Sequence, residues 1–185
     1  IGSTTLWAAA YMNVFRQPDS RLAASQWITQ HVPAGSKILI EPSHNTPLTG
    51  SYLTEVNFNR NYVLFYPRTE WQDYYHLYVL DTYRSLYNRG VTDDFRRDYI
   101  RSRLALADWI VIDDTYLQQY QHLPESEHGV VKQYYRDLFA GRLGFKLVKT
   151  FKVYPALFGV EINDDAAELT FRSFDHPRVF VFMRQ

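Results

Sequence analysis

The sequence contains no cysteine among its 185 residues. This absence excludes disulfides, catalytic thiols, iron–sulfur clusters and zinc sites built on thiolates. It does not fix the cellular compartment, because a domain of this size can fold in an oxidising space without disulfide bonds. The sequence also lacks a run of about 18 apolar residues, so we expect no membrane-spanning helix within it.

Signals for a cofactor or a metal are also missing. The eight glycines stand singly, and neither GxGxxG nor GxxxxGK[ST] occurs, so no nucleotide cofactor is expected. The GxSxG and HExxH motifs are absent as well. The nearest pair of histidines, His122 and His128, has no third ligand at metal spacing. We therefore expect no cofactor, no metal and no recognisable catalytic residue.

Charge of either sign is not concentrated anywhere. Twenty basic and twenty acidic residues cancel, and the densest basic stretch, Arg96 to Arg103, is interrupted by Asp98. A nucleic-acid surface needs clustered positive charge, so we expect no nucleic-acid partner.

Aromatic residues are the abundant class, with fifteen tyrosines and twelve phenylalanines. Many of the tyrosines lie between Tyr52 and Tyr99. Tyrosine combines a large apolar ring with a polar tip, which suits half-buried surfaces, carbohydrate stacking and membrane interfaces. An aromatic core with tyrosines on the sheet faces is the simplest interpretation, and the aromatic middle is a candidate contact surface.

Two helix-then-strand units can be recognised from the pattern. Asp19 to His31 has helical spacing, with Asp19 or Ser20 as the cap and Trp27 as the expected anchor. The apolar run Lys37 to Ile40 follows after a turn. Thr92 begins a second helix through Leu104, and the apolar run Trp109 to Ile112 follows it. Strands covered on both faces are apolar throughout, so we expect the two runs to be adjacent and parallel.

The rest of the chain gives weaker patterns. We predict a strand over Asn59 to Tyr66, helices over Trp71 to Tyr87 and Val130 to Ala140, and a loop over His122 to Gly129. Strand patterns then close the sequence at Phe145 to Phe151, Leu169 to Phe174 and Val179 to Met183.

Together these patterns predict an α/β fold in one soluble domain over residues 1–185. We expect a Rossmann-like layered sheet, mainly parallel with helices on both faces, and an antiparallel or mixed C-terminal edge. The first fifteen residues contain the apolar patch Leu6 to Met12 and are a candidate juxtamembrane segment. The chain begins at Ile1 rather than Met, which we interpret as a segment of a longer protein.

Topology places a candidate ligand site at the ends of the two buried strands. Ligands of parallel α/β sheets bind outside the carboxyl ends of the strands. Glu41 and His44 follow the first strand, and Asp113 and Asp114 follow the second. Together they could serve acid–base chemistry or hold a cation. The alternative is that these polar groups cap helices and satisfy loop backbone.

The C-terminal sequence Asp175, His176, Pro177 allows two interpretations. A buried aspartate that orients an imidazole is half of a catalytic triad, but no nucleophile elbow accompanies it. A turn in which Asp175 bonds local backbone and Pro177 fixes the entry to the last strand is simpler.

Several blocks resemble a known family. These are Arg16 to Ile40, Tyr135 to Phe151, and Ala167 to Phe182 with its FDHPRVFVF motif downstream of Asp164 and Asp165. They look like the C-terminal soluble part of bacterial polytopic membrane proteins similar to the dolichyl-phosphate-mannose protein mannosyltransferases, glycosyltransferase family 39. The blocks touch about half of the chain.

The resemblance implies a parent enzyme with many membrane spans that transfers a sugar from a polyprenyl-phosphate donor. Its catalytic acid would lie in an early extracytoplasmic loop, outside this segment. The expected function is then a non-catalytic domain on the extracytoplasmic face of the bacterial cell membrane. Its partners would be the membrane portion of the parent protein and a carbohydrate or protein acceptor. The alternative is a free-standing α/β hydrolase-like enzyme acting at Glu41, His44, Asp113 and Asp114.

Overall fold

The computed structural model describes residues 2–41, 75–88 and 90–185, and it is built around a five-stranded sheet. The strand order is β2-β1-β3-β7-β4. The bounds of the strands are β1 Lys37–Ile40, β2 His76–Val79, β3 Trp109–Asp113, β4 Phe145–Phe151 and β7 Val179–Arg184. A small separate hairpin is formed by β5 Ala156–Leu157 and β6 Val160–Glu161.

Three of the strands are parallel. β1 lies between β2 and β3 and pairs with both in the same direction. Ile38, Leu39 and Ile40 of β1 are fully buried, as expected of a strand covered on both faces. The prediction that Lys37–Ile40 and Trp109–Ile112 form adjacent parallel strands is therefore confirmed.

The C-terminal side of the sheet is antiparallel. β7 pairs in the opposite direction with β3 and with β4, so the expected antiparallel C-terminal edge is confirmed. The sheet has two parallel and two antiparallel pairings, which makes it mixed rather than mainly parallel. Edge strand β4 exposes Lys146 and Lys149, and such charges discourage pairing with another chain.

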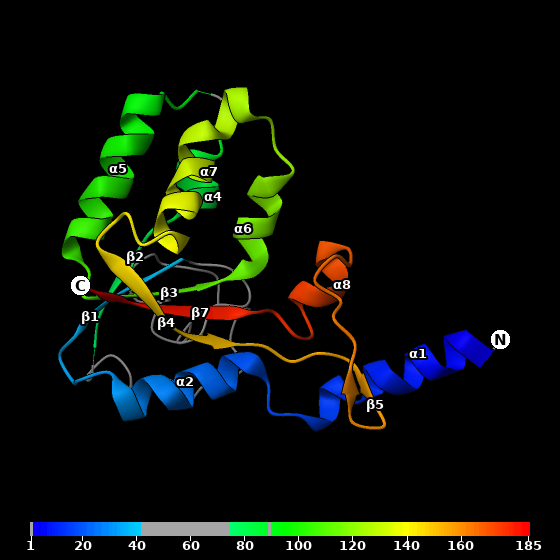
Figure 1. The fold of residues 1–185 in the computed structure, drawn as a ribbon. Helices are drawn as coiled ribbons and strands as arrows, with labels where there is room; N and C mark the ends of the chain where they lie inside the picture. The colour runs from blue at the N-terminus through cyan, green and yellow to red at the C-terminus, as the bar shows by residue number, and fades with distance from the viewer. Residues whose placement is uncertain (1, 42–74, 89) are drawn as a thin grey trace.

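Helices cover both faces of this sheet (Figure 1). α2 lies under one face, while α5, α6 and α7 lie over the other (Figure 1). The bounds of the helices are α1 Gly2–Met12, α2 Ser20–His31, α4 Thr82–Leu86, α5 Asp93–Leu106, α6 Asp114–Gln121, α7 Glu125–Phe139, α8 Leu169–Ser173 and the short 3₁₀ helix η1 Val14–Arg16.

Side-chain caps fix where the two predicted helices begin. The Asp19 carboxylate accepts a hydrogen bond from the backbone N–H of Arg21, and the Thr92 hydroxyl accepts one from that of Phe95. Each bond satisfies a backbone donor that the first helical turn leaves open. Both predicted starts are therefore confirmed.

The core has two parts because alternate strand residues point to opposite faces. Leu39, Ile110 and Phe182 pack under α5 and α7. On the opposite face, Ile28 of α2 packs among a second set of strand residues. Ile28 is fully buried, whereas Trp27 is only half-buried at the margin of this set. Ile28, rather than the predicted Trp27, is the deepest anchor of α2.

Two predicted elements are wrong. Leu169–Ser173 is helix α8 rather than a strand, because the Glu168 side chain caps it by accepting from the N–H of Thr170. The helix predicted over Trp71 to Tyr87 is replaced, within the described residues, by strand β2 and then the short helix α4, which Asp81 caps.

Two further outcomes concern the predicted loop and the middle of the chain. α7 begins at Glu125, inside the loop predicted over His122 to Gly129. The strand predicted over Asn59 to Tyr66 lies outside the described residues.

Candidate functional site

The carboxyl ends of β1 and β3 bring three of the four predicted site residues to one edge of the sheet. Glu41, Asp113 and Asp114 are all buried there. The fourth, His44, lies outside the described residues. Each of the three carboxyl groups has its own hydrogen-bond partners, described below, and these partners lie on different sets of elements.

Glu41 points toward α4 and α7. Its Oε1 accepts hydrogen bonds from the hydroxyls of Thr82 and Tyr135. The Thr82 carbonyl in turn accepts a 2.8 Å bond from the hydroxyl of Tyr120. Glu41 therefore joins the end of β1 to α4 and α7 through side chains that are themselves buried.

Burial decides the protonation of this group. It raises the pKa of Glu41 to about 8, although the bonds from Thr82 and Tyr135 act in the opposite direction and the charge of Asp113 adds to the increase. Burial and the nearby Glu41 also raise the pKa of Tyr134 and Tyr135. A carboxyl group that stays protonated at neutral pH has the form that a general acid needs. Glu41, however, is only 2% exposed.

Asp113 is a helix cap. Its Oδ1 accepts a 2.8 Å hydrogen bond from the backbone N–H of Thr115, in the first turn of α6, which follows β3 directly. The capping interpretation is confirmed for this residue, and the bond satisfies an open donor of the first turn.

Asp114 is the centre of an ion network. Its Oδ1 accepts from the backbone N–H of Arg178 at 3.0 Å, and its Oδ2 accepts from the Arg178 guanidinium at 2.9 Å. Gln118 of α6 donates to the same Oδ2 at 2.6 Å. Asp114 thus fixes the start of β7 against the start of α6.

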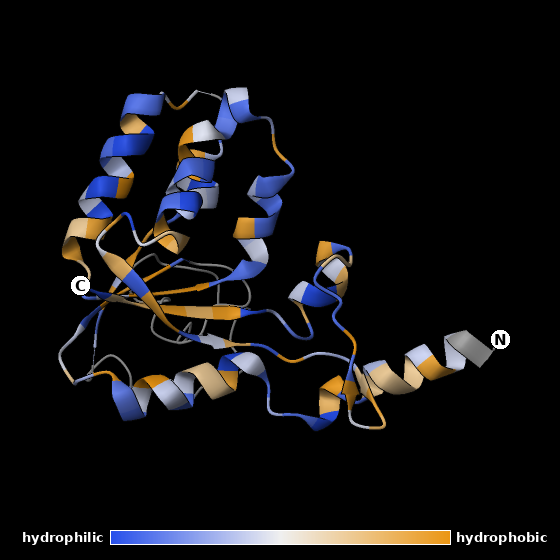
Figure 2. Cartoon of the chain, viewed as in Figure 1, coloured by the Kyte–Doolittle hydropathy of each residue, from blue (hydrophilic) through white to orange (hydrophobic). Residues whose placement is uncertain are grey.

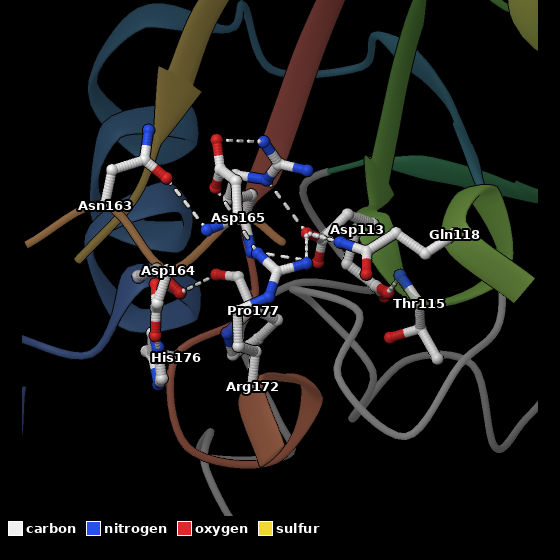
Figure 3. A network of polar contacts seen from close by, with 12 residues as sticks. Asp113, Thr115, Gln118, Asn163, Asp164, Asp165, Arg172, His176 and Pro177 are labelled. Carbon is white, nitrogen blue, oxygen red and sulfur yellow. Dashed lines mark hydrogen bonds and ion pairs between the residues drawn. The ribbon is translucent and has the colours of Figure 1, made fainter. Parts of the chain in front are cut away.

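A second arginine completes the network (Figure 3). Arg172 of α8 is 2% exposed and lies 3.4 Å from the carboxylate of Asp114 and 3.5 Å from that of Asp165. Arg178 also contacts Asp165, at 3.0 Å. Two guanidinium groups therefore meet two carboxylates, and the charges of the four groups balance. Such an arrangement holds loops together.

A buried aspartate–histidine pair lies beside this network (Figure 3). The imidazole Nε2 of His176 is 2.8 Å from Oδ2 of Asp164, and both residues are buried. The partner is therefore Asp164 and not the adjacent Asp175, whose carboxylate accepts from the hydroxyl of Tyr11. The backbone N–H of His176 donates to the carbonyl of Arg172, so α8 leads directly into this turn.

Sequence reasoning missed Arg172, Arg178 and Asp164 as parts of this edge. The only sequence signal for them was that acidic and basic residues occur close together over 164–178. The sequence does not show which strands these residues connect, because Asp114, a partner of both arginines, lies far away along the chain. In the described part of the chain, no group of three or more His, Asp or Glu side chains could hold a metal ion. The described helices include none that is long and apolar enough to cross a membrane.

Comparisons with known proteins assign no relative to this arrangement. The chain matches no family model, no curated protein and no solved structure.

Proposed function

We propose that this chain is a non-catalytic domain that rests against the membrane portion of a larger membrane protein, on its extracytoplasmic face. In this proposal the membrane portion is a mannosyltransferase-like, polyprenyl-phosphate-sugar-dependent glycosyltransferase, as the resemblance of the blocks above implies. The domain stabilises that portion and helps to position a carbohydrate or protein acceptor. We also propose that its layered sheet is Rossmann-like.

The observation that carries the proposal is Phe158 at the tip of the β5–β6 hairpin. Phe158 is 92% exposed, and its φ of 50° is followed by a φ of 83° at Gly159. Positive φ at both central residues is the condition for a type I′ turn, where asparagine and glycine are preferred. A bulky residue in this conformation destabilises the fold. Phe158 is therefore explained better by a contact outside the chain than by folding.

The hairpin tip belongs to a larger apolar surface. α1 packs beside β5 and extends away from the sheet (Figure 1). We call the exposed side chains of this region the apolar end, and its members are Leu6, Met12, Phe15, Phe158 and Val160. Figure 2 shows α1 and the hairpin in apolar colours at the same end of the molecule. Exposed apolar side chains that gather in one region of a molecule mark sites of protein or membrane contact.

The composition of α1 favours a membrane interface as that contact. The helix has eleven residues and none of them is charged. It also carries Trp7 and Tyr11, the residue types that gather at membrane–water interfaces.

Tyr11 connects this helix to the polar network. Its hydroxyl donates to the carboxylate of Asp175 and to the carbonyl of Phe171, and its ring meets the His176 ring edge-on at 5.7 Å. α1 is therefore held by the turn that contains His176, the partner of Asp164. A supporting role for that pair agrees with the proposal.

The alternative, an enzyme acting at Glu41, His44, Asp113 and Asp114, receives less support. Asp113 is occupied as a cap, Asp114 neutralises two arginines, and Glu41 binds two hydroxyls in the interior. These roles are structural, and each carboxyl group is at most 2% exposed.

Co-flotation with vesicles of phosphatidylcholine and phosphatidylglycerol tests the proposal. We expect the chain to float with the vesicles, and the variant Leu6→Ser/Phe158→Ser to remain largely in solution. Phe95→Ser is the matched control, because Phe95 is 52% exposed on α5, away from the apolar end. A chain that fails to float, or equal loss in the control, would contradict the proposal.

A further inference from the structure

A hollow of about 480 Å³ lies between α6 and α7, and we call it the α6–α7 hollow. Four aromatic rings contribute to its lining, those of Tyr120, Tyr135, Phe139 and Phe180. This volume is within the range of small-molecule sites, which are mainly apolar with a few polar groups. The rings offer flat apolar surface to a ligand that carries a ring or a short apolar group.

The charged side chains of the lining are all basic. Lys132, Arg136 and Arg178 line the hollow, and no acidic residue of the described chain does. Lys132 and Arg136 are one turn apart on α7 and share the carboxylate of Glu125, at 3.1 Å and 2.8 Å. One carboxylate between two cations leaves an excess positive charge at this wall of the hollow.

The position of the third cation, Arg178, is fixed by ion pairs. Arg178 is held by Asp114 and Asp165, which also balance Arg172, so this side is neutral and pre-organised. The guanidinium of Arg178 lies 5.8 Å from the centre of the Phe180 ring, which places it beside the aromatic part of the lining. Guanidinium groups bind phosphate oxygens in a fixed, two-pronged geometry, so a held arginine suits such a ligand.

The location agrees with a ligand site. Arg178 holds Asp114 at the end of β3, and Tyr135 holds Glu41 at the end of β1. The hollow is therefore lined by the partners of both carboxyl groups, next to the carboxyl ends of the parallel strands. Ligands of open α/β sheets bind on this side.

We propose that the α6–α7 hollow binds a phosphate monoester whose other part is a ring or a short apolar group. A phosphate monoester carries more negative charge and more acceptor oxygens than a carboxylate. The excess charge of the Lys132 and Arg136 wall, with the N–H donors of Arg178 opposite, therefore suits a phosphate monoester better. The site is independent of the apolar end, so this inference goes beyond the membrane-contact function and does not rest on it.

Titration of the purified chain with phenyl phosphate, followed by NMR and calorimetry, tests the inference. We expect saturable binding that shifts resonances of α6 and α7. Phenol lacks the charge, inorganic phosphate lacks the ring and benzoate has the weaker anion, so each should bind at least about tenfold more weakly. Equal binding of inorganic phosphate, or no saturable binding of phenyl phosphate, would overturn the proposal.

Matched variants locate the site. Arg136 and Arg97 are surface arginines with 49% and 51% exposed side chains, and each is paired with a carboxylate. Arg136→Gln should weaken phenyl phosphate binding several-fold, whereas Arg97→Gln on α5 should leave it unchanged. Leu117→Trp should block the hollow without a change in charge. Equal effects of the two arginine variants would show a general charge effect and refute the site, as would full binding by a folded Leu117→Trp variant.

Discussion

The hydroxyl of Tyr135 on α7 donates a hydrogen bond to the carboxyl group of Glu41, which lies 94 positions earlier at the end of β1. Thr82 at the start of α4 donates to the same oxygen. Glu41 therefore connects three elements through one buried group, and its proton is part of the folded structure. This connection makes the stability of the chain sensitive to pH.

We expect Glu41 to lower the stability of the chain as the pH rises. The pKa of its carboxyl group is raised by burial from an ordinary value of 4.5 to about 8. Between these values the folded state keeps a proton that the unfolded state has released, so the free energy of unfolding falls with increasing pH. The stabilisation is complete below about pH 4.5 and lost above about pH 8. Its size is on the order of a few kcal/mol.

Urea unfolding across this pH window, compared between the wild-type chain and Glu41→Gln, provides the measurement. Glutamine keeps an oxygen that can accept from Thr82 and Tyr135 but has no titrating proton. The variant should therefore lose this part of the pH dependence and be the more stable chain at the alkaline end. Glu161→Gln, at an exposed position on β6, is the control and should leave the slope unchanged. Parallel slopes for wild type and Glu41→Gln would refute the protonated state.

Asp114→Ala should be among the most destabilising single substitutions in the chain. It would leave the buried guanidinium of Arg172 and that of Arg178 with Asp165 as the carboxylate they share. Loss of one partner from a buried ion network costs about 3–5 kcal/mol. Asp94→Ala breaks the exposed pair with Arg97, where Asp94 is 90% exposed, and should cost less than about 1 kcal/mol. Denaturant unfolding of both variants checks the difference, and similar losses would contradict it.

Local patterns predicted the parallel part of the fold. The apolar runs at Lys37–Ile40 and Trp109–Ile112 could be paired correctly because each follows a capped helix and has no polar face. A weaker pattern gave a wrong prediction where a helix-capping side chain opposed the strand propensity of the residues that follow it. Leu169–Ser173 contains residues that favour strands, yet the Glu168 side chain satisfies the helix start and a helix forms.

The sequence predicted where the candidate site lies, but not which residues contact one another there. Topology alone brought Glu41, Asp113 and Asp114 to one edge. Their partners could not be predicted, because Arg178 reaches Asp114 across 64 positions and the pairing of β7 with β3 decides this contact. The histidine of the Asp175–His176 turn was noticed, but its aspartate is Asp164, which only the tertiary structure brings near.

Tyr11→Ala should release α1 from the body of the chain without unfolding the sheet. The tyrosine side chain provides the described hydrogen bonds from α1 to Asp175 and Phe171. Limited proteolysis with trypsin is the measurement, because Arg16 follows directly in η1 and cleavage there requires local opening. We expect faster cleavage after Arg16 in the variant, with unchanged circular dichroism of the remainder. Tyr83→Ala, at an exposed tyrosine of α4, should leave the cleavage rate unaltered.

Phe158→Asn should stabilise the folded chain while it weakens vesicle binding. Asparagine tolerates positive φ better than phenylalanine, and asparagine before Gly159 is the pair that type I′ turns favour. The expected gain in the free energy of unfolding is about 0.5–1 kcal/mol, the range for relief of an unfavourable backbone conformation. Urea unfolding and vesicle flotation of the same preparation measure the two effects together.

Gly159→Ala, at the neighbouring position of the hairpin tip, should have the opposite effect on the free energy of unfolding. A Cβ there meets no atom within 4 Å, so the substitution tests the positive φ of 83° alone and should destabilise the chain by about 1 kcal/mol. It leaves Phe158 in place, and vesicle binding should persist as long as the hairpin stays folded.

If Phe158→Asn instead lowered stability, the ring would have an intramolecular role that its 92% exposure does not show. Greater stability with weaker binding would mean that Phe158 serves contact rather than folding.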